Sequence, residues 1–257
     1  MSASTGALVI DLYHQAQDYF FVSISQFYRR FGSGLSAYCT GVEASSLNLL
    51  MMNDRAVDEP GPLAEGVAFL QRTGMPFCVV VPETLVPRVS GQLHQQHLLA
   101  ADKTTCMVLD LTRHEPRQAL AAQAQVRCSD LRLEDWAQPV QSAFESGEGG
   151  IEQYLARHRA ALSAGRALSH FTLYVQERPV SALTLSLLPG LARLDDIGTV
   201  QDCQGQGYAT ALIQAVLAFA RARGARTCVL EASLDGLSIY RKAGFEPLFD
   251  YRTFCQE

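Results

Sequence analysis

The sequence lacks any block of lysine or arginine, and the formal net charge of its 257 residues is −5 at pH 7. A chain without a basic block is poorly suited to bind nucleic acid or an anionic membrane surface, so we expect neither as a partner. No apolar run reaches the roughly 18 residues that a membrane span needs. The N-terminal residues also lack the basic and then apolar pattern of a secretory signal. We therefore expect a cytoplasmic protein.

The seven cysteines include no Cys-x-x-Cys pair. Their odd number and scattered spacing indicate neither a zinc site nor a disulfide framework, and no metal is expected. Cys78 and Cys228 lie inside apolar runs. We therefore expect them to be small buried hydrophobic residues in a reducing compartment.

What the sequence does contain is an ordinary globular composition, with 48% hydrophobic and 18% charged residues. This length suits one large α/β domain or two half-sized ones. Apolar residues at helical spacing predict a first helix from about Ile10 to Phe31, ended by Gly32 and Gly34. The pattern then predicts a helix, a strand, a helix and a strand at residues 63–73, 77–81, 85–97 and 105–111.

From about Val126 the pattern predicts two helices and then three strands joined by short turns, which form an antiparallel meander. A glycine-rich loop, a helix, a strand, a short helix and a last strand follow. These elements are expected at residues 130–144, 151–162, 170–175, 179–187, 191–200, 208–223, 227–231, 237–242 and 245–254.

The two parts of the chain share a register at an offset of 150 residues. The identical pairs are Ala68/Ala218, Phe69/Phe219, Gly74/Gly224, Cys78/Cys228 and Val79/Val229. Together with the matching element order, these identities favour a duplication. We expect units at 1–120 and 126–257, with 112–125 as the connector. The first unit carries no glycine loop at 54–61, so a duplicated first unit has lost its ligand site there.

The loop Gln204-Gly205-Gln206-Gly207 is the motif that carries chemistry, because it lies between a predicted strand and a predicted helix. The glycines allow close backbone approach, and the free amides at the start of the helix favour an anion such as a pyrophosphate. A dinucleotide fold fits less well, since Thr210 replaces the third small residue and the upstream meander is antiparallel. No Gly-Lys-Ser/Thr follows, which excludes a P-loop. A glycine-rich turn without a ligand is the remaining alternative.

The Gln-x-x-Gly-x-Ala pattern of Gln204, Gly207 and Ala209 is followed by Tyr240, Gly244 and Phe245 at a suitable separation. Over residues 126–254 the chain resembles the GNAT acetyltransferase superfamily. The first unit resembles, more weakly, the degenerate N-terminal half of tandem GNAT proteins. The resemblance implies an α+β fold, a mixed sheet with flanking helices, in two GNAT-like units.

The resemblance also implies that acetyl-CoA is the co-substrate, held where the strands ending at Thr199 and Glu231 separate. The backbone of the first strand would pair with the pantetheine arm, and the loop amides would hold the pyrophosphate. Many family members carry Asn where this chain has Ser233, so that contact differs. The expected binding residues are Ile197, Gly198, Thr199, Gln204, Gly205, Gln206, Gly207, Tyr208, Ala209, Thr210, Ser233 and Tyr240.

Acetyl transfer to an amine needs a base for the amine and a proton for the departing thiolate. By resemblance, Tyr240 supplies that proton. Asp195 and Asp196 are adjacent on a strand, so their side chains are expected on opposite faces, with one of them facing the acceptor. Either one, Glu231 or a water chain is a candidate base. His170 is expected to be a surface residue.

These observations predict an N-acetyltransferase that moves an acetyl group from acetyl-CoA to a primary amine on a small molecule or a peptide. Two alternatives remain open: a CoA-binding sensor without turnover, and an acyltransferase with another acyl donor or a hydroxyl acceptor. The acceptor and the oligomeric state do not follow from the sequence.

Overall fold

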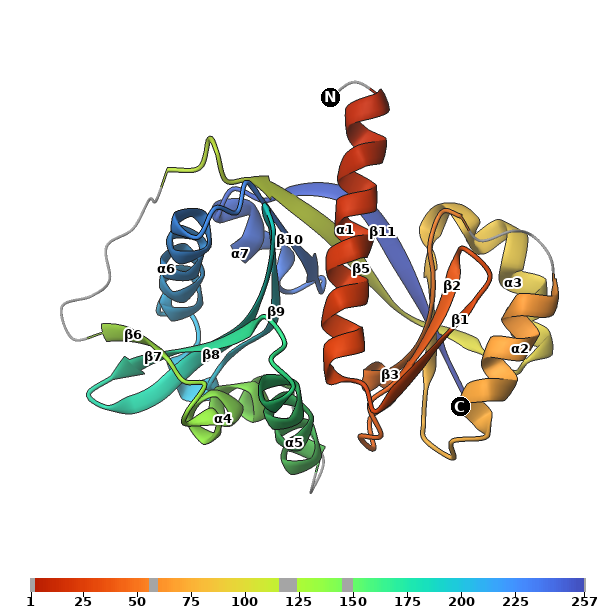
Figure 1. Cartoon of the computed structure of the whole chain (residues 1–257), viewed down its shortest axis with the longest axis horizontal. Helices are drawn as coiled ribbons and strands as arrows, with labels where there is room; N and C mark the ends of the chain where they lie inside the picture. Colours follow the sequence, from red (N-terminus) through yellow and green to blue (C-terminus); the bar gives the residue numbers. More distant parts are fainter. Residues whose placement is uncertain (1–2, 56–59, 116–123, 145–149, 257) are drawn as a thin grey trace.

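The computed structural model describes residues 3–55, 60–115, 124–144 and 150–256. Its strands form one mixed eleven-stranded sheet in the order β1-β2-β3-β4-β11-β5-β10-β9-β8-β7-β6 (Figure 1). Helices pack on both faces, so the α+β fold is as predicted. The strands are β1 (Phe27–Phe31), β2 (Leu35–Cys39), β3 (Asn48–Met52), β4 (Cys78–Pro82), β5 (Leu99–Asp110), β6 (Ala124–Cys128), β7 (Leu168–Val175), β8 (Arg178–Leu188), β9 (Leu191–Thr199), β10 (Thr227–Ala232) and β11 (Glu246–Cys255). The helices are α1 (Ala3–Ile24), α2 (Pro60–Gln71), α3 (Val86–Gln95), α4 (Leu133–Phe144), α5 (Gly150–Ser163), α6 (Tyr208–Ala222) and α7 (Leu237–Lys242).

The first helix is shorter at its C-terminal end than the sequence predicts. α1 ends at Ile24, and the residues from Phe27 to Phe31 form the edge strand β1. The aromatic residues of this segment fit helical spacing, but four of its five residues are exposed, as an outer strand allows. Gly32, which was expected to end the helix, adopts a positive φ of 70° in the turn to β2.

Each half of the sheet is an antiparallel ladder that ends in a parallel pair. In the C-terminal half, β7, β8 and β9 form the predicted meander, and β9 runs parallel to β10. In the N-terminal half, β1, β2 and β3 form the ladder, and β3 runs parallel to β4. Strands β1 to β3 were not predicted from the sequence. Residues 56–59, in the segment expected to have lost its loop, and 116–123, in the connector, lie outside the described residues.

The two halves exchange their last strands. β5 comes from the N-terminal half of the chain but pairs with β10 and β11, while β11 pairs with β4 and β5. These two long strands cross the middle of the molecule side by side (Figure 1). Each half of the sheet is therefore completed by the other half of the chain.

A disulfide bond between Cys78 and Cys255 joins β4 to the exchanged strand β11, with the Cα atoms 4.4 Å apart. The expectation that Cys78 is a free thiol was therefore wrong. The cause is the exchange, which brings together two cysteines 177 residues apart in the sequence. Cys228 is a buried free thiol, as expected.

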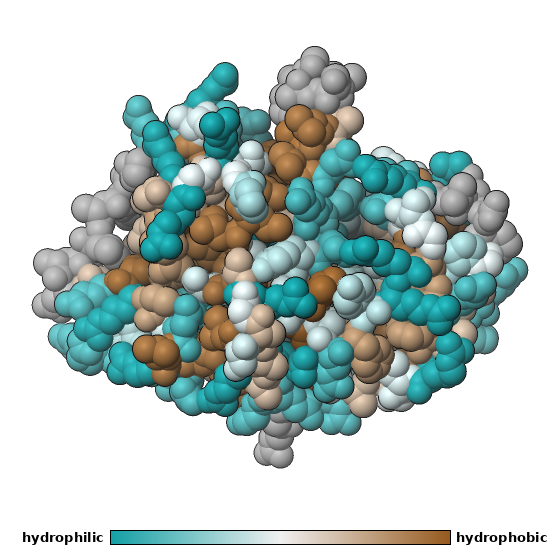
Figure 2. Space-filling model, in the orientation of Figure 1, coloured by the Kyte–Doolittle hydropathy of each residue, from teal (hydrophilic) through white to brown (hydrophobic). Residues whose placement is uncertain are grey.

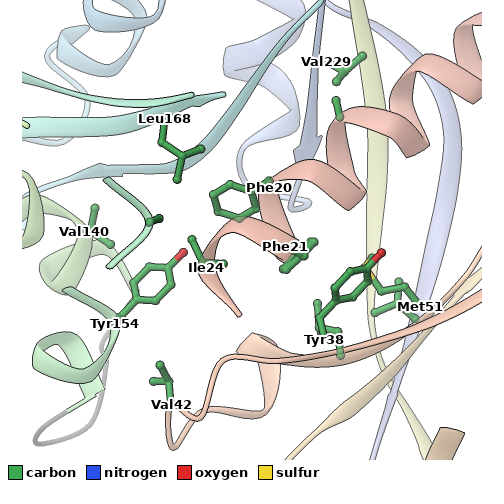
Figure 3. Close-up of a cluster of buried hydrophobic side chains, with 14 of the residues drawn as sticks. Phe20, Phe21, Ile24, Tyr38, Val42, Met51, Val140, Tyr154, Leu168 and Val229 are labelled. Carbon is green, nitrogen blue, oxygen red and sulfur yellow. The ribbon is translucent and has the colours of Figure 1, made fainter. Parts of the chain in front are cut away.

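Helix α1 packs between the halves and joins their cores on one face of the sheet (Figure 1). Its residues Phe20, Phe21 and Ile24 contact a cluster that extends from Tyr38 in the N-terminal half to Tyr154 on α5 (Figure 3). On the outer surface, hydrophobic residues gather beside α1 over the C-terminal half, whereas the N-terminal half is mostly hydrophilic (Figure 2). Within the described residues, no helix combines the length and apolarity needed to cross a membrane.

Candidate active site

The parallel strands β9 and β10 separate toward their C-terminal ends. Their pairing covers Leu191 to Leu194 on β9, although β9 continues to Thr199 and β10 continues to Ala232. The β9 edge from Asp195 to Thr199 therefore has no strand partner on the β10 side. The predicted binding residues Ile197, Gly198 and Thr199 lie on this edge.

A β-bulge shapes the same segment. Asp196 has a positive φ of 54°, and the register of β9 with β8 shifts between Ala182 and Thr184. A bulge places two residues of one strand opposite a single residue of its partner and turns their side chains. The expectation that Asp195 and Asp196 point to opposite faces was wrong, because the bulge interrupts the alternation. Both carboxylates lie on the face covered by α1 and α5, since Asp195 contacts Arg193 and Asp196 contacts Tyr154.

The glycine loop follows β9 and leads into α6. Gly205 and Gly207 have φ values of 74° and 83°, which favour glycine at both positions. No side chain caps α6, and within the described part of the chain the amides of Tyr208, Ala209 and Thr210 donate no hydrogen bond to another residue. The loop is exposed from Gln204 to Gly207. Free amides and the positive end of the helix dipole make this an anion site.

Asp195 is held by a buried arginine. Arg193 is only 2% exposed, and its Nε donates to Asp195 Oδ1 and Oδ2 at 2.9 and 3.0 Å. Burial raises the pKa of Asp195 to about 6, although the Arg193 charge opposes this shift and Glu231 reinforces it. Asp195 is therefore a carboxylate engaged in an ion pair.

Asp196 has hydroxyl donors in place of a bound cation. The Tyr154 hydroxyl donates to Oδ1, and the Thr184 hydroxyl donates to Oδ2, both at 2.7 Å. Burial, and then the charge of Asp195, raises the pKa of Asp196 to about 7. A carboxyl with this pKa exchanges protons near neutral pH, as a general base must.

Glu231 lies at the end of β10 and is fixed by the N-terminal half of the chain. Its carboxylate accepts hydrogen bonds from Thr104 on β5 at 2.6 Å and from Tyr13 on α1 at 3.2 Å. Gln17 on α1 donates to it at 3.5 Å. The first half therefore forms one wall of the carboxylate cluster.

Tyr240 on α7 packs against the core cluster of the C-terminal half, which includes Leu194 and Ile213. Burial, and then the charge of Asp195, raises the pKa of Tyr240 to about 12, so its hydroxyl is protonated at neutral pH. A Cβ atom at Gly236 would lie 2.8 Å from the Tyr240 ring, so this glycine makes room for the tyrosine. Ser233 Oγ accepts a hydrogen bond from the Gly236 amide, which places it in the turn before α7.

Sequence reasoning missed Tyr154, Arg193 and His158, and it misplaced His170. His170 is fully buried and lies 2.8 Å from His158, so the expectation of a surface residue was wrong. The strand that His170 was expected to open begins two residues earlier, at Leu168, and α4 and α5 cover it. A histidine followed by strand residues has the same local pattern whether its side chain is exposed or buried, so the sequence does not distinguish the two.

Comparison with known proteins agrees with this geometry. Residues 131–245 match the model of the Acetyltransferase (GNAT) family. This part of the chain is a GNAT acetyltransferase domain. No curated protein matches the sequence.

Several solved structures share the fold of nearly the whole chain. A GCN5-related N-acetyltransferase from Kribbella flavida has a TM-score of 0.67 at 14% identity, covering 94% of this chain and 93% of that one. Another, from Sphaerobacter thermophilus, has a TM-score of 0.64 at 16% identity, covering 87% and 76%. A tandem GNAT protein from the clavulanic acid biosynthesis pathway has a TM-score of 0.60 at 14% identity, covering 98% and 94%. The chain thus shares the fold of these proteins over most of its length.

Proposed function

We propose that the chain is an N-acetyltransferase that moves an acetyl group from acetyl-CoA to a primary amine. The observation that carries the proposal is the juxtaposition at the end of β9. An unpaired strand edge, a loop of free amides and a carboxyl with a pKa of about 7 follow one another within residues 195–210.

The strand edge and the loop fit the two parts of a CoA molecule. The edge at Ile197 to Thr199 offers backbone groups to the amide-containing pantetheine arm, as an added strand would. The amides from Gly205 to Thr210 suit the pyrophosphate, with Gln204 and Gln206 flanking them. Acetyl-CoA supplies the activated acetyl group as a thioester, and the chain needs no other reactive group.

Among the three carboxylates, Asp196 is the best placed to take the proton of the amine. Asp195 is already paired with Arg193, and Glu231 is held by three donors from α1 and β5. Among the described residues, Asp196 receives hydrogen bonds from the hydroxyls of Tyr154 and Thr184 alone. Glu231 adds negative charge that attracts a cationic acceptor into the cluster.

Tyr240 has the properties of the proton donor for the departing thiolate. Its raised pKa keeps the proton on the hydroxyl until a strong base forms nearby. Its hydroxyl makes no hydrogen bond to any residue that the structure describes, so it is available to a ligand. The acceptor is proposed as a small molecule or a peptide that carries a primary amine.

The first test is titration with acetyl-CoA by calorimetry. We expect binding in the micromolar range for the intact protein and none for Gly207→Trp, because a large side chain there blocks the loop. The matched control is Gly190→Trp, in the exposed turn between β8 and β9, where φ is 75°. It imposes a similar backbone strain at the opposite end of β9 and should bind acetyl-CoA like the intact protein.

The second test is turnover. A panel of amino acids, polyamines and lysine peptides is offered with acetyl-CoA, and the released thiol is measured. Release that depends on the amine supports the proposal. Tight binding without release across the panel indicates a CoA sensor instead, and no binding by the intact protein rejects the site.

A further inference from the structure

Two buried histidines connect the proposed base to the surface. His158 on α5 and His170 on β7 are both fully buried, with His158 Nδ1 2.8 Å from His170 Nε2. His170 Nδ1 lies 2.8 Å from Asp130 Oδ1, and the Asp130 side chain is 28% exposed. At the other end, His158 Nε2 lies 3.7 Å from Asp196 Oδ2.

The hydrogen bonds of Asp130, at the surface end of the chain, determine which nitrogen of each histidine ring carries the proton. Asp130 Oδ1 also accepts from the His170 backbone amide at 2.7 Å, and its Oδ2 accepts from the Cys128 thiol at 3.2 Å. Burial raises the pKa of Asp130, but hydrogen bonds from His170 and Cys128 outweigh it and lower the pKa below the usual value. An ionised Asp130 requires His170 to carry its proton on Nδ1. When His170 is neutral, its Nε2 is an acceptor, and His158 donates to it from Nδ1.

In this arrangement the lone pair of His158 Nε2 accepts no hydrogen bond from the described residues. His158 Nε2 is buried and faces Asp196, and it has no hydrogen-bond partner among the residues that the structure describes. Burial, with the neighbouring His170, lowers the pKa of His158 well below its usual value, so the ring is neutral. The Nε2 lone pair of His158 can therefore accept a proton from a protonated Asp196.

The surroundings isolate the pair from water. Trp136 on α4 packs against both rings, with centroids 4.5 Å from His158 and 5.0 Å from His170. Tyr154 packs 4.5 Å from His158, and Phe20 on α1 lies 6.3 Å from it. The charged or titratable groups that face the pair are thus Asp130, Asp196, Tyr154 and Arg157, together with Cys128 beside Asp130.

We propose that Asp196, His158, His170 and Asp130 form a proton relay that carries the proton of the acceptor amine from the active site to the protein surface. The proposal rests on the function proposed above, because the amine is the source of the proton. Asp196, once protonated, gives its proton to His158 Nε2. His158 passes its Nδ1 proton to His170 Nε2, and His170 passes its Nδ1 proton to Asp130. Each ring gains one proton and loses one, so the net change is one proton moved from Asp196 to Asp130.

The relay is tested by Asp130→Asn, which keeps an oxygen to accept from His170 but cannot take up a proton. The matched control is Asp135→Asn on α4. Asp135 has nearly the same side-chain exposure, 27% against 28%, and accepts a hydrogen bond from the Tyr174 hydroxyl instead. With acetyl-CoA and the fastest amine of the panel, Asp130→Asn should lower kcat by about tenfold. Asp135→Asn should leave kcat within about twofold, and both variants should keep acetyl-CoA affinity.

A proton inventory of kcat in mixtures of light and heavy water separates a relay from a merely structural role. The intact protein should give a curved inventory, because several protons move together, and Asp130→Asn should give a linear one. The relay is rejected if Asp130→Asn keeps kcat within about twofold of the intact protein, or if both variants lower kcat equally.

A second measurement does not depend on turnover and keeps the relay distinct from the proposed function. If the intact protein acetylates no amine, the proposed function fails, and nitrogen NMR of the histidines decides on the chain of hydrogen bonds. For the proposed transfer, His158 should carry its proton on Nδ1, and His170 should carry a proton on Nδ1. A His158 that carries its proton on Nε2, or on both nitrogens, overturns the proposed direction of transfer.

Discussion

The parallel pairs β3–β4 and β9–β10 hold corresponding places in the two halves but differ in what they carry. On the face covered by α1, the N-terminal pair presents Leu49, Met51, Val80 and the disulfide-bonded Cys78, all buried. On the same face, the C-terminal pair presents Arg193, Asp195, Asp196 and Glu231. The comparison shows that one backbone arrangement serves as packing in one half and as a charged site in the other.

The difference also extends to tyrosine–aspartate pairs. Tyr154 donates to Asp196 at 2.7 Å in the C-terminal half, and Tyr38 donates to Asp18 at 2.7 Å in the N-terminal half. Asp18 is 33% exposed and also pairs with Arg30, whereas Asp196 is 12% exposed and has no bound cation. Asp18 is therefore a partly exposed carboxylate balanced by an arginine, whereas Asp196 is a more deeply buried one that accepts from two hydroxyl groups.

The largest expected effect is on kcat, and it tests the comparison between Asp196 and Asp18 directly. Asp196→Asn should lower kcat by about a thousandfold, because the amide cannot take up a proton. Asp18→Asn removes the matching carboxylate of the first half and should leave kcat within about twofold. Both are measured by thiol release with acetyl-CoA and an amine. Equal losses in the two variants would show that the carboxylates serve the fold and not the reaction.

A smaller effect, on stability, is expected for the Cys78–Cys255 disulfide that joins β4 to β11. Cys255→Ser should lower the free energy of unfolding by about 3 kcal/mol, because the bond restricts a long loop of the unfolded chain. Denaturant unfolding measures the change. Dithiothreitol should destabilise the intact protein to a similar extent and leave Cys255→Ser unaffected. A thiol titration of the denatured, unreduced protein that counts all seven cysteines as free would contradict the bond.

The last effect concerns the dependence of stability on pH. Because the pKa of Asp196 is about 7 when folded and about 4 when unfolded, the folded state binds more protons between these values. Ionisation of Asp196 therefore costs stability as pH rises through this window. Asp196→Asn should therefore raise the free energy of unfolding at pH 8 by up to about 4 kcal/mol, because three pKa units correspond to that energy, and change it little at pH 4. Equal changes in the free energy of unfolding at both pH values would show that ionisation of Asp196 is not the cause.

The sequence predicted the C-terminal half well because glycines and prolines mark its boundaries. The helix after the loop begins at Tyr208 as expected, and α7 spans Leu237–Lys242 as expected. In the first half, no glycine or proline separates α1 from β1. The segment from Phe27 to Phe31 continues the aromatic spacing of α1, so the pattern hides the change from helix to strand.

The loop and Tyr240 were found from the sequence because their residues are close together or follow a known spacing. The arrangement of the carboxylates was not found, since a single bulge residue reverses the alternation of a strand. The His158–His170 contact and the strand exchange join residues of different elements. Such pairings depend on the assembled sheet, and no local sequence pattern predicts them.

The exchange of β5 and β11 has a consequence for synthesis on the ribosome. β11 follows every other element in the chain, yet it lies at the centre of the sheet, between β4 and β5. Until it emerges, β4 and β5 each present an open strand edge to the surrounding medium, and open edges invite pairing with other chains. The first half of this protein cannot finish folding when its own residues have been made; it must wait for the last strand of the second.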